Sequence, residues 1–292
     1  MDNNGNKILT LDQRIAKDLN ELNTIGEIQD AIKLNGLIEA KSGQTSFATR
    51  ALPGYYAGDR NGKTVMVMLN PGVDVDVANN NLKCDICKRS MKDAGDIENY
   101  HKWSVNYGHE DKERKDNFDL KQAFFLNKWI GTEIALPKGL SVDSDRQTKQ
   151  DAKEIVLTQK LQMDLIPYAS SRFSAFNKSK LELIVPFVET LFDEIFSRED
   201  RYVIFCARLF EDVFNKYNEV HPDSVEMINI QNKWIPFRGK SAPGHCIGLK
   251  INHNSKKMKA LIANTFPRQD LPGAYDLMES YGEFCYNEYQ KL

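Results

Sequence analysis

The sequence has no long hydrophobic run: nowhere in its 292 residues is an apolar stretch long enough to span a bilayer. The N-terminal residues MDNNGNKILTLDQR contain no apolar core of the kind that signal peptides carry. The five cysteines are few, odd in number and scattered along the chain. This cysteine usage suits a reducing compartment, so we expect a cytoplasmic protein with no membrane partner.

Neither sign of charge is in large excess, with 39 Lys and Arg against 41 Asp and Glu and a net charge of −2. This balance excludes a globally basic nucleic-acid-binding protein, although a local basic surface is compatible with it. The hydrophobic content of 41% and the aromatic content of 10% are sufficient for a substantial core.

Several well-known catalytic and nucleotide-binding motifs are missing. The chain has no G-x-S-x-G nucleophile elbow, no G-x-x-x-x-G-K phosphate loop and no G-x-G-x-x-G turn. Hydrolases of the elbow type, P-loop NTPases and dinucleotide-binding enzymes are therefore not the leading interpretations. The sequence also has no internal repeat and no low-complexity segment.

Strand-like and helix-like segments alternate along the chain. Short apolar runs predict strands, and apolar positions at a spacing of three or four residues predict helices. Alternation of the two favours a three-layer α/β/α domain with a mainly parallel central sheet. The predicted strands are 64–69, 161–166, 202–206 and 224–230, with a hairpin of 246–251 and 258–264; the main predicted helices are 118–130, 148–160, 181–196, 209–217 and 275–289.

The chain is predicted to divide into two parts. Residues 1–45 are expected to form an N-terminal helical extension, broken near Gly26. Residues 46–292 are expected to form the α/β domain. Within it, about 74–160 is predicted to be a long insertion, because its first part is rich in Asn, Asp and Lys, and such long loops are usually functional or mobile.

The most informative segment is 52–72, which reads LPGYYAGDRNGKTVMVMLNPG. Its apolar run ends abruptly at Asn70-Pro71-Gly72, where proline and glycine force a turn. Ligands bind at the ends of strands in open α/β sheets, so Asn70 is predicted to reach a site. The alternative is that this tripeptide is only a turn between a strand and a loop.

Three motifs in order resemble the uracil-DNA glycosylase superfamily. Leu69-Asn70-Pro71-Gly72 resembles the water-positioning GINPG motif of the mismatch-specific and thymine-DNA glycosylase branch. Asp164-Leu165-Ile166-Pro167 resembles the N-L-x-P segment of the single-strand-selective branch, whose Asn reads the flipped base. The segment 263–268, ANTFPR, follows the last strand, where the family places its H-P-S loop into the DNA. The preceding segment 53–59 is also similar to a P-x-x-Y-x-G-D leader of bacterial members.

The resemblance implies a uracil-DNA glycosylase-like fold over most of residues 50–290 and a monofunctional DNA glycosylase. Such an enzyme flips a base out of DNA and hydrolyses its N-glycosidic bond with no cofactor and no obligate protein partner. Asn70 would hold the attacking water, and Pro71 and Gly72 would shape the turn beside it. Asp74 is a candidate base for activating that water, although it fits equally well as a loop acid.

Asp164 stands where the family has Asn. An ionised carboxylate only accepts hydrogen bonds, so it would pair with an amino group such as N4 of cytosine. We therefore hypothesise that the enzyme prefers a cytosine-like or modified base. The alternative role for Asp164 is to cap a turn or to pair with Arg172.

Aromatic and polar residues near these motifs are candidate contacts. Tyr55 and Tyr56 would stack on the flipped base, or else cover the edge of the core. Tyr168 is a candidate substrate contact that, with Ser170 and Arg172, would touch phosphate or sugar, and helix capping is the alternative for the serine.

The third motif provides further candidates. Phe266, Pro267 and Arg268 would enter the base stack and hold the backbone, or else form an ordinary proline-terminated loop. The family His is missing there, and Asn264 or Thr265 is nearest in position. This departure favours a second hypothesis, a non-catalytic nucleic-acid or nucleotide-binding module with the same fold. A third hypothesis is a structural or interaction protein whose pocket is vestigial.

One metal-ligand pattern is present. Cys84 and Cys87 form a C-x-x-C pair, and His101 and His109 would complete a tetrahedral zinc site. A single C-x-x-C lacks the second pair that makes such a pattern specific. We therefore predict no metal and keep zinc as an alternative.

Overall fold

Strand β2 (Thr64–Met68) lies at the centre of a mixed β-sheet, and every one of its five residues is buried. Burial on both faces explains why its sequence TVMVM is apolar without alternation. The computed structural model describes residues 8–38, 46–70, 95–106, 118–129, 134–170, 177–230, 246–263 and 274–292. The other strands of this part are β1 (Tyr56–Gly58), β3 (Leu161–Asp164), β4 (Tyr202–Phe205), β5 (Val225–Asn229), β6 (Cys246–His253) and β7 (Lys256–Ala263).

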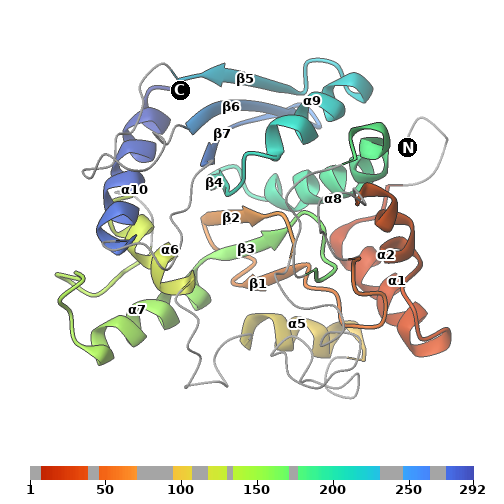
Figure 1. Cartoon of the computed structure of the whole chain (residues 1–292), viewed down its shortest axis with the longest axis horizontal. Helices are drawn as coiled ribbons and strands as arrows, with labels where there is room; N and C mark the ends of the chain where they lie inside the picture. The colour runs from red at the N-terminus through yellow and green to blue at the C-terminus, as the bar shows by residue number, and fades with distance from the viewer. Residues whose placement is uncertain are drawn as a thin grey trace.

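The strand order is β1-β3-β2-β4-β7-β6-β5 (Figure 1). The inner four, β3, β2, β4 and β7, run parallel to one another. Strand β1 adds antiparallel to β3 at one edge, and β6 and β5 add antiparallel beyond β7 at the other. The predicted α/β class with a mainly parallel centre is confirmed at this level.

The hairpin between β6 and β7 is built as the sequence predicts. Asn254 and Ser255 form its two-residue turn with φ angles of 48° and 66°. Two consecutive positive φ values are typical of the hairpin turn whose twist matches that of the flanking strands. The turn fixes the register, which pairs His253 with Lys256 and Cys246 with Ala263.

Helices cover both faces of the sheet, as Figure 1 shows. On one face lie α1 (Leu11–Thr24), α2 (Gln29–Leu34), α8 (Val185–Ile195) and α9 (Phe210–Val220). On the other lie α6 (Phe118–Asn127), α7 (Arg146–Gln159) and α10 (Ala274–Gln290), while α5 (Ile97–Asn106) packs beside β1. The short 3-10 helices are η1 (Asn35–Leu37) and η2 (Lys178–Ile184).

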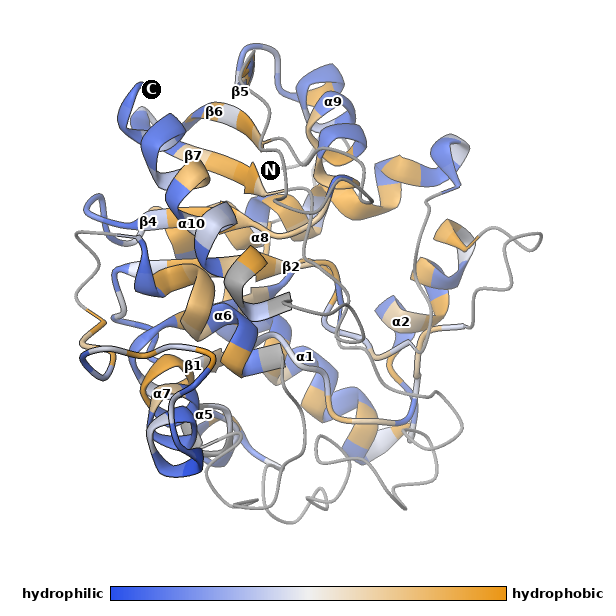
Figure 2. Ribbon diagram, turned by 60° about the vertical axis from the view of Figure 1, so that its left-hand side comes forward, coloured by the Kyte–Doolittle hydropathy of each residue, from blue (hydrophilic) through white to orange (hydrophobic). Residues whose placement is uncertain are grey.

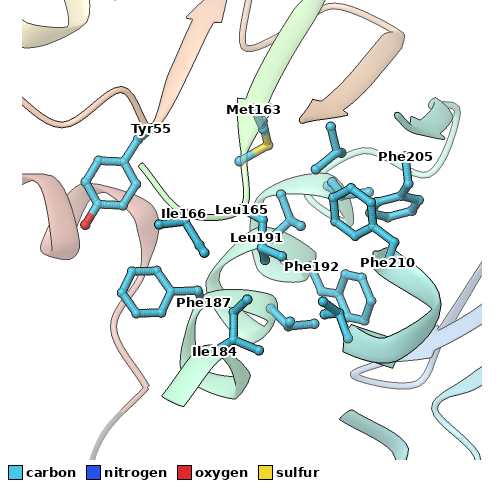
Figure 3. Close-up of a cluster of buried hydrophobic side chains, with 14 of the residues drawn as sticks. Tyr55, Met163, Leu165, Ile166, Ile184, Phe187, Leu191, Phe192, Phe205 and Phe210 are labelled. Carbon is cyan, nitrogen blue, oxygen red and sulfur yellow. The ribbon is translucent and has the colours of Figure 1, made fainter. Parts of the chain in front are cut away.

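Each face therefore has its own hydrophobic core. The core under α1, α8 and α9 contains an aromatic group that includes Phe187, Phe192, Phe205 and Phe210 (Figure 3). The core under α6 and α10 contains Trp129, Phe124 and Phe125. Figure 2 shows that β2 and the end of β7 are hydrophobic, which is expected because β2 and residues 260–263 of β7 are buried.

Helix α10 approaches α6 closely at Gly282. A Cβ atom there would collide with the backbone of Phe125, so only glycine allows this contact.

Helix α1 starts with a complete capping box. The Thr10 hydroxyl accepts from the Gln13 N–H at 3.3 Å, and the Gln13 side chain accepts from the Thr10 N–H at 3.1 Å. The same helix is held to α8 because Arg14 donates to the Thr190 hydroxyl at 2.5 Å and to the Pro186 carbonyl at 2.8 Å. The division into an extension and a main domain stays a prediction, but α1 clearly contributes to the first core.

Two elements differ from the prediction. Strand β1 was not predicted, and it is only three residues long. The single helix expected at 181–196 is divided into η2 and α8, with Pro186 in the first turn of α8, where its missing N–H costs nothing. None of the helices in the described segments combines the length and the apolar composition needed to cross a bilayer.

Candidate functional site at the carboxyl ends of the strands

The four parallel strands β3, β2, β4 and β7 end on the same side of the sheet, so their carboxyl ends lie next to one another. After β2 the chain forms β3 on one side of it, and the next parallel strand, β4, lies on its other side. The strand order therefore reverses at β2 and β4. In open α/β sheets a ligand crevice lies outside the carboxyl ends of the strands at such a reversal.

Asn70 lies two positions beyond the end of β2 and is partly exposed. The segment after β3 runs beside it, because Leu165 N–H donates to Met68 O at 3.0 Å and Ile166 N–H donates to Leu69 O at 2.8 Å. The Asn70 amide nitrogen also donates to Tyr168 O at 3.4 Å. The first two sequence motifs are thus neighbours in space, and the Asn70 amide is held between them.

Asp164 is the last residue of β3 and pairs with Met68 of β2. Within the described part of the chain its carboxyl group forms no hydrogen bond and no ion pair. Part of the residue reaches solvent, and the surrounding protein desolvates its carboxyl group. This desolvation raises the pKa of Asp164 from 3.8 to about 8, against the opposing effect of the Lys160 charge.

The raised pKa changes what Asp164 can do. At neutral pH its carboxyl group is mostly protonated, and a protonated carboxyl both donates and accepts hydrogen bonds. The hypothesis from the sequence took this group as an ionised acceptor, and the burial corrects that premise. A neutral Asp164 offers the same donor-and-acceptor pair as an asparagine amide.

Lys160 is a buried residue of this region that the sequence did not single out. Its side chain is completely inaccessible, and its ammonium group donates to Gln162 Oε1 at 3.1 Å. Gln122 of α6 donates to the same oxygen at 3.4 Å. Lys160 directly precedes β3, and Gln162 and Asp164 follow it at alternate positions, opposite Leu161 and Met163 of the core under α1, α8 and α9. These three polar side chains form a row that ends at Asp164. The only sequence signal was polar residues at alternate positions of an otherwise apolar strand.

Cys206 follows the last residue of β4 and is partly exposed. Its backbone N–H donates to Val67 O at 2.8 Å, so it lies beside the end of β2. Desolvation raises the pKa of the Cys206 thiol far above its usual value. The thiol is therefore neutral and a poor nucleophile.

Tyr55 and Tyr168 lie on the other face of the sheet from Asp164. Both are buried, and both hydroxyls donate to the Asp18 Oδ2 atom of α1, at 2.8 Å and 2.9 Å. Burial raises the pKa of Asp18 to about 7, while the two tyrosine hydrogen bonds lower it. This arrangement favours the core alternative for Tyr55 over contact with a base, and it gives the Tyr168 hydroxyl a partner in the same core.

Tyr56 is also buried, and its hydroxyl lies 2.6 Å from His101 Nδ1 of α5. The other ring nitrogen of His101 lies 3.5 Å from Asp12, which also binds Arg60 at 2.8 Å. The His101 ring is therefore already paired on both sides. No group of three His, Cys, Asp or Glu side chains in the described segments could hold a metal ion. Cys84, Cys87 and His109 lie outside those segments.

Several predicted site residues also lie outside the described residues: Pro71, Gly72, Asp74, Arg172, Asn264, Phe266, Pro267 and Arg268. Their roles stay predictions. Ser170 is described and buried, three positions beyond Pro167. Ala263, the last residue of β7, pairs with Cys246 of β6 and lies at the same end of the parallel strands as Asn70.

Comparison with known proteins gives no relative: no family model, no curated protein and no solved structure matches the chain.

Proposed function

We propose that the protein is a monofunctional DNA glycosylase, a hydrolase of N-glycosidic bonds in DNA. The observation that carries this proposal is the juxtaposition of Asn70 and Asp164 at the ends of two neighbouring parallel strands. These are the residues that the resemblance to uracil-DNA glycosylases assigns to water positioning and base reading. Asn70 is partly exposed at the strand-order reversal, where a ligand is expected.

The chemistry requires few residues. As the bond to the base breaks, the sugar gains positive charge and the base gains negative charge, and fixed dipoles stabilise both. The Asn70 carbonyl oxygen would accept a hydrogen bond from the attacking water, while its amide nitrogen keeps the contact with Tyr168 O. Because the Asn70 amide is neutral, it orients the water without adding a fixed charge beneath the developing cation.

Asp164 would bind the Watson–Crick edge of the flipped base. The protonated carboxyl of Asp164 can donate to N3 of cytosine and accept from its amino group, or bind the N–H and carbonyl of uracil. Above a pH of about 8 the group is mostly an ionised acceptor, which repels a carbonyl oxygen. The proposed preference for a cytosine-like or modified base therefore increases as the pH rises through this value.

Single-turnover incubation with DNA oligonucleotides tests the proposal. The substrates carry uracil, cytosine or a modified cytosine, and the measurement is strand cleavage at abasic sites after alkali. We expect abasic sites with at least one base, and their loss in the Asn70→Ala variant. Asn20→Ala, which removes an exposed asparagine of α1, is the matched control and should keep full activity.

Two results would contradict the proposal. If no substrate gives abasic sites but the protein binds DNA, the non-catalytic binding module with the missing third-motif His is the better description. If Asn70→Ala cleaves as fast as the wild type, Asn70 does not position the water.

A further inference from the structure

The hairpin of β6 and β7 presents a row of lysines on one face. Leu249, Ile251 and Met258 point into the core under α8 and α9. Alternation along the strands places Lys250, Asn252, Lys257 and Lys259 on the opposite face. Lys250, Asn252 and Lys257 are exposed, and Lys259 is partly exposed.

Helix α10 covers only part of this face. The C-terminal residue Leu292 packs against Gly248, where a Cβ atom would collide with it. Beyond Gly248 toward the turn, the next residue on the same face of β6 is Lys250. The four residues Lys250, Asn252, Lys257 and Lys259, called here the lysine face, thus begin where the helical cover ends.

The lysine face concentrates positive charge at a cost. Lys250 and Lys259 stand directly opposite each other in the ladder, and like charges at such positions destabilise a sheet. Lys259 lies 4.8 Å from the centre of the Tyr289 ring, which offsets part of its desolvation. Lys250, Lys257 and Lys259 form no salt bridge within the segments that the structure describes.

Two exposed acidic residues lie nearby. Asp223 O accepts a hydrogen bond from the Asn252 side chain at 3.2 Å, which places Asp223 beside the lysine face. Glu226 of β5 pairs with Lys250 on its other side, but the two side chains form no ion pair. Lys256 also belongs to the hairpin, but it points to the other face, where it binds Phe196 O at 3.1 Å and Glu199 at 3.6 Å. Within the described segments the lysine face therefore carries three lysines without a salt bridge, in a protein whose net charge is −2.

We propose that the lysine face binds the phosphodiester backbone of duplex DNA. Lys257 and Lys259 are two residues apart, about 7 Å along the strand, and Lys250 lies about 5 Å away on the next strand. Duplex DNA carries one phosphate per about 3.4 Å on each strand, so it is a partner that supplies several anions over this small area. Neutralisation by phosphates removes the repulsion between Lys250 and Lys259.

The lysine face lies away from the candidate site. Lys257 and Ala263 are six positions apart in β7, which corresponds to about 20 Å. A duplex that occupies both would be held by its backbone about six base pairs from the flipped base. The choice of DNA as the partner rests on the proposed function. The cluster of lysines is an observation that does not depend on that function.

The experiment measures the salt dependence of binding to a fluorescent duplex that contains only ordinary base pairs. Each lysine that neutralises a phosphate contributes about 0.9 to the slope of log affinity against log salt concentration. We expect the triple variant Lys250→Gln, Lys257→Gln, Lys259→Gln to lower that slope by about 2.7. The ratio of the wild-type affinity to that of the triple variant should therefore fall roughly 40-fold between 50 and 200 mM salt.

Two further variants keep the test specific. The control triple Lys33→Gln, Lys102→Gln, Lys178→Gln removes the same charge from exposed lysines elsewhere and should leave the slope unchanged. Glu226→Gln removes the acid beside Lys250 and should tighten binding. Lys257→Gln alone changes one exposed side chain and should lower the slope by about 0.9, which guards against misfolding of the triple variant.

The proposal is overturned if both triple variants lose affinity equally, because then only net charge matters. It is also overturned if the wild type binds vesicles containing phosphatidylserine through these lysines but does not bind DNA. Abasic-site formation at saturating DNA is measured separately. Cleavage that depends on Asn70 but not on the three lysines, together with an unchanged slope, would refute the lysine face and leave the glycosylase proposal standing.

Discussion

Replacing Asp164 by asparagine is expected to stabilise the folded protein, and the gain should increase with pH. Asparagine has nearly the same size as aspartate and offers both a donor and an acceptor, but it cannot ionise. The wild-type carboxyl group has a pKa of about 8 in the folded protein, against 3.8 in the unfolded chain. Between these values the folded state holds a proton that the unfolded state has lost, so wild-type stability falls as the pH rises.

The size of the effect follows from these two values. Stability falls by about 1.4 kcal/mol for each pH unit between the unfolded and the folded pKa. At pH 7 the pH lies about three units above the unfolded pKa of 3.8. The free energy of unfolding of the wild type is therefore lower than that of a protein with a neutral side chain at this position by about 4 kcal/mol at most. The cost is absent below pH 3.8 and levels off above about pH 8.

Urea denaturation of the wild type and Asp164→Asn at several pH values measures this difference. Other titrating groups, such as Asp18, are common to both proteins and cancel. Asp145→Asn is the control: this exposed aspartate caps α7, and hydrogen bonds from Thr148 lower its pKa. Wild-type Asp145 contributes stability above its unfolded pKa that is lost as the pH falls, which is the opposite trend. A difference for Asp164→Asn that is independent of pH would refute the burial of the Asp164 carboxyl group.

Two further predictions concern residues remote from the chemistry. Tyr168→Phe removes one of the two hydrogen bonds that stabilise ionised Asp18, so the pKa of Asp18 should rise above its value of about 7, as followed by NMR titration of the carboxyl carbon. The loss of stability should also be larger at pH 8 than at pH 5, and an unchanged titration would show that the bond is not made. Gly282→Ala should destabilise by about 1–3 kcal/mol because its Cβ meets the Phe125 backbone, whereas Glu283→Ala on the exposed side of α10 should change stability by less than about 0.5 kcal/mol.

The parallel strands and the hairpin could be predicted because their signals are local. The run at 64–68 is apolar over the length of a buried strand, and Asn254 and Ser255 are turn residues between two apolar runs. The position of Asn70 followed from the same logic, since the apolar run that forms β2 stops just before it. These features depend on residues a few positions apart.

The features that the sequence did not predict depend on long-range contacts. Strand β1 is recognisable only because β3 pairs with it, and its three residues carry no pattern of their own. The protonated state of Asp164 depends on its surroundings in the folded sheet and on Lys160, whose burial gave only a faint alternating signal. The side chain of Asp18 meets Tyr55 and Tyr168, which are 37 and 150 positions away. No spacing rule connects residues so far apart.

The contact between Asp18 and Tyr168 has a consequence during synthesis. Translation at about 5–20 residues per second leaves Asp18 without this tyrosine for about 8–30 s. Over that time the apolar side of α1 has no complete sheet to cover, since β3 is not yet made. A nascent chain of this protein should therefore be a substrate for holding chaperones until β3 and the segment after it emerge from the ribosome.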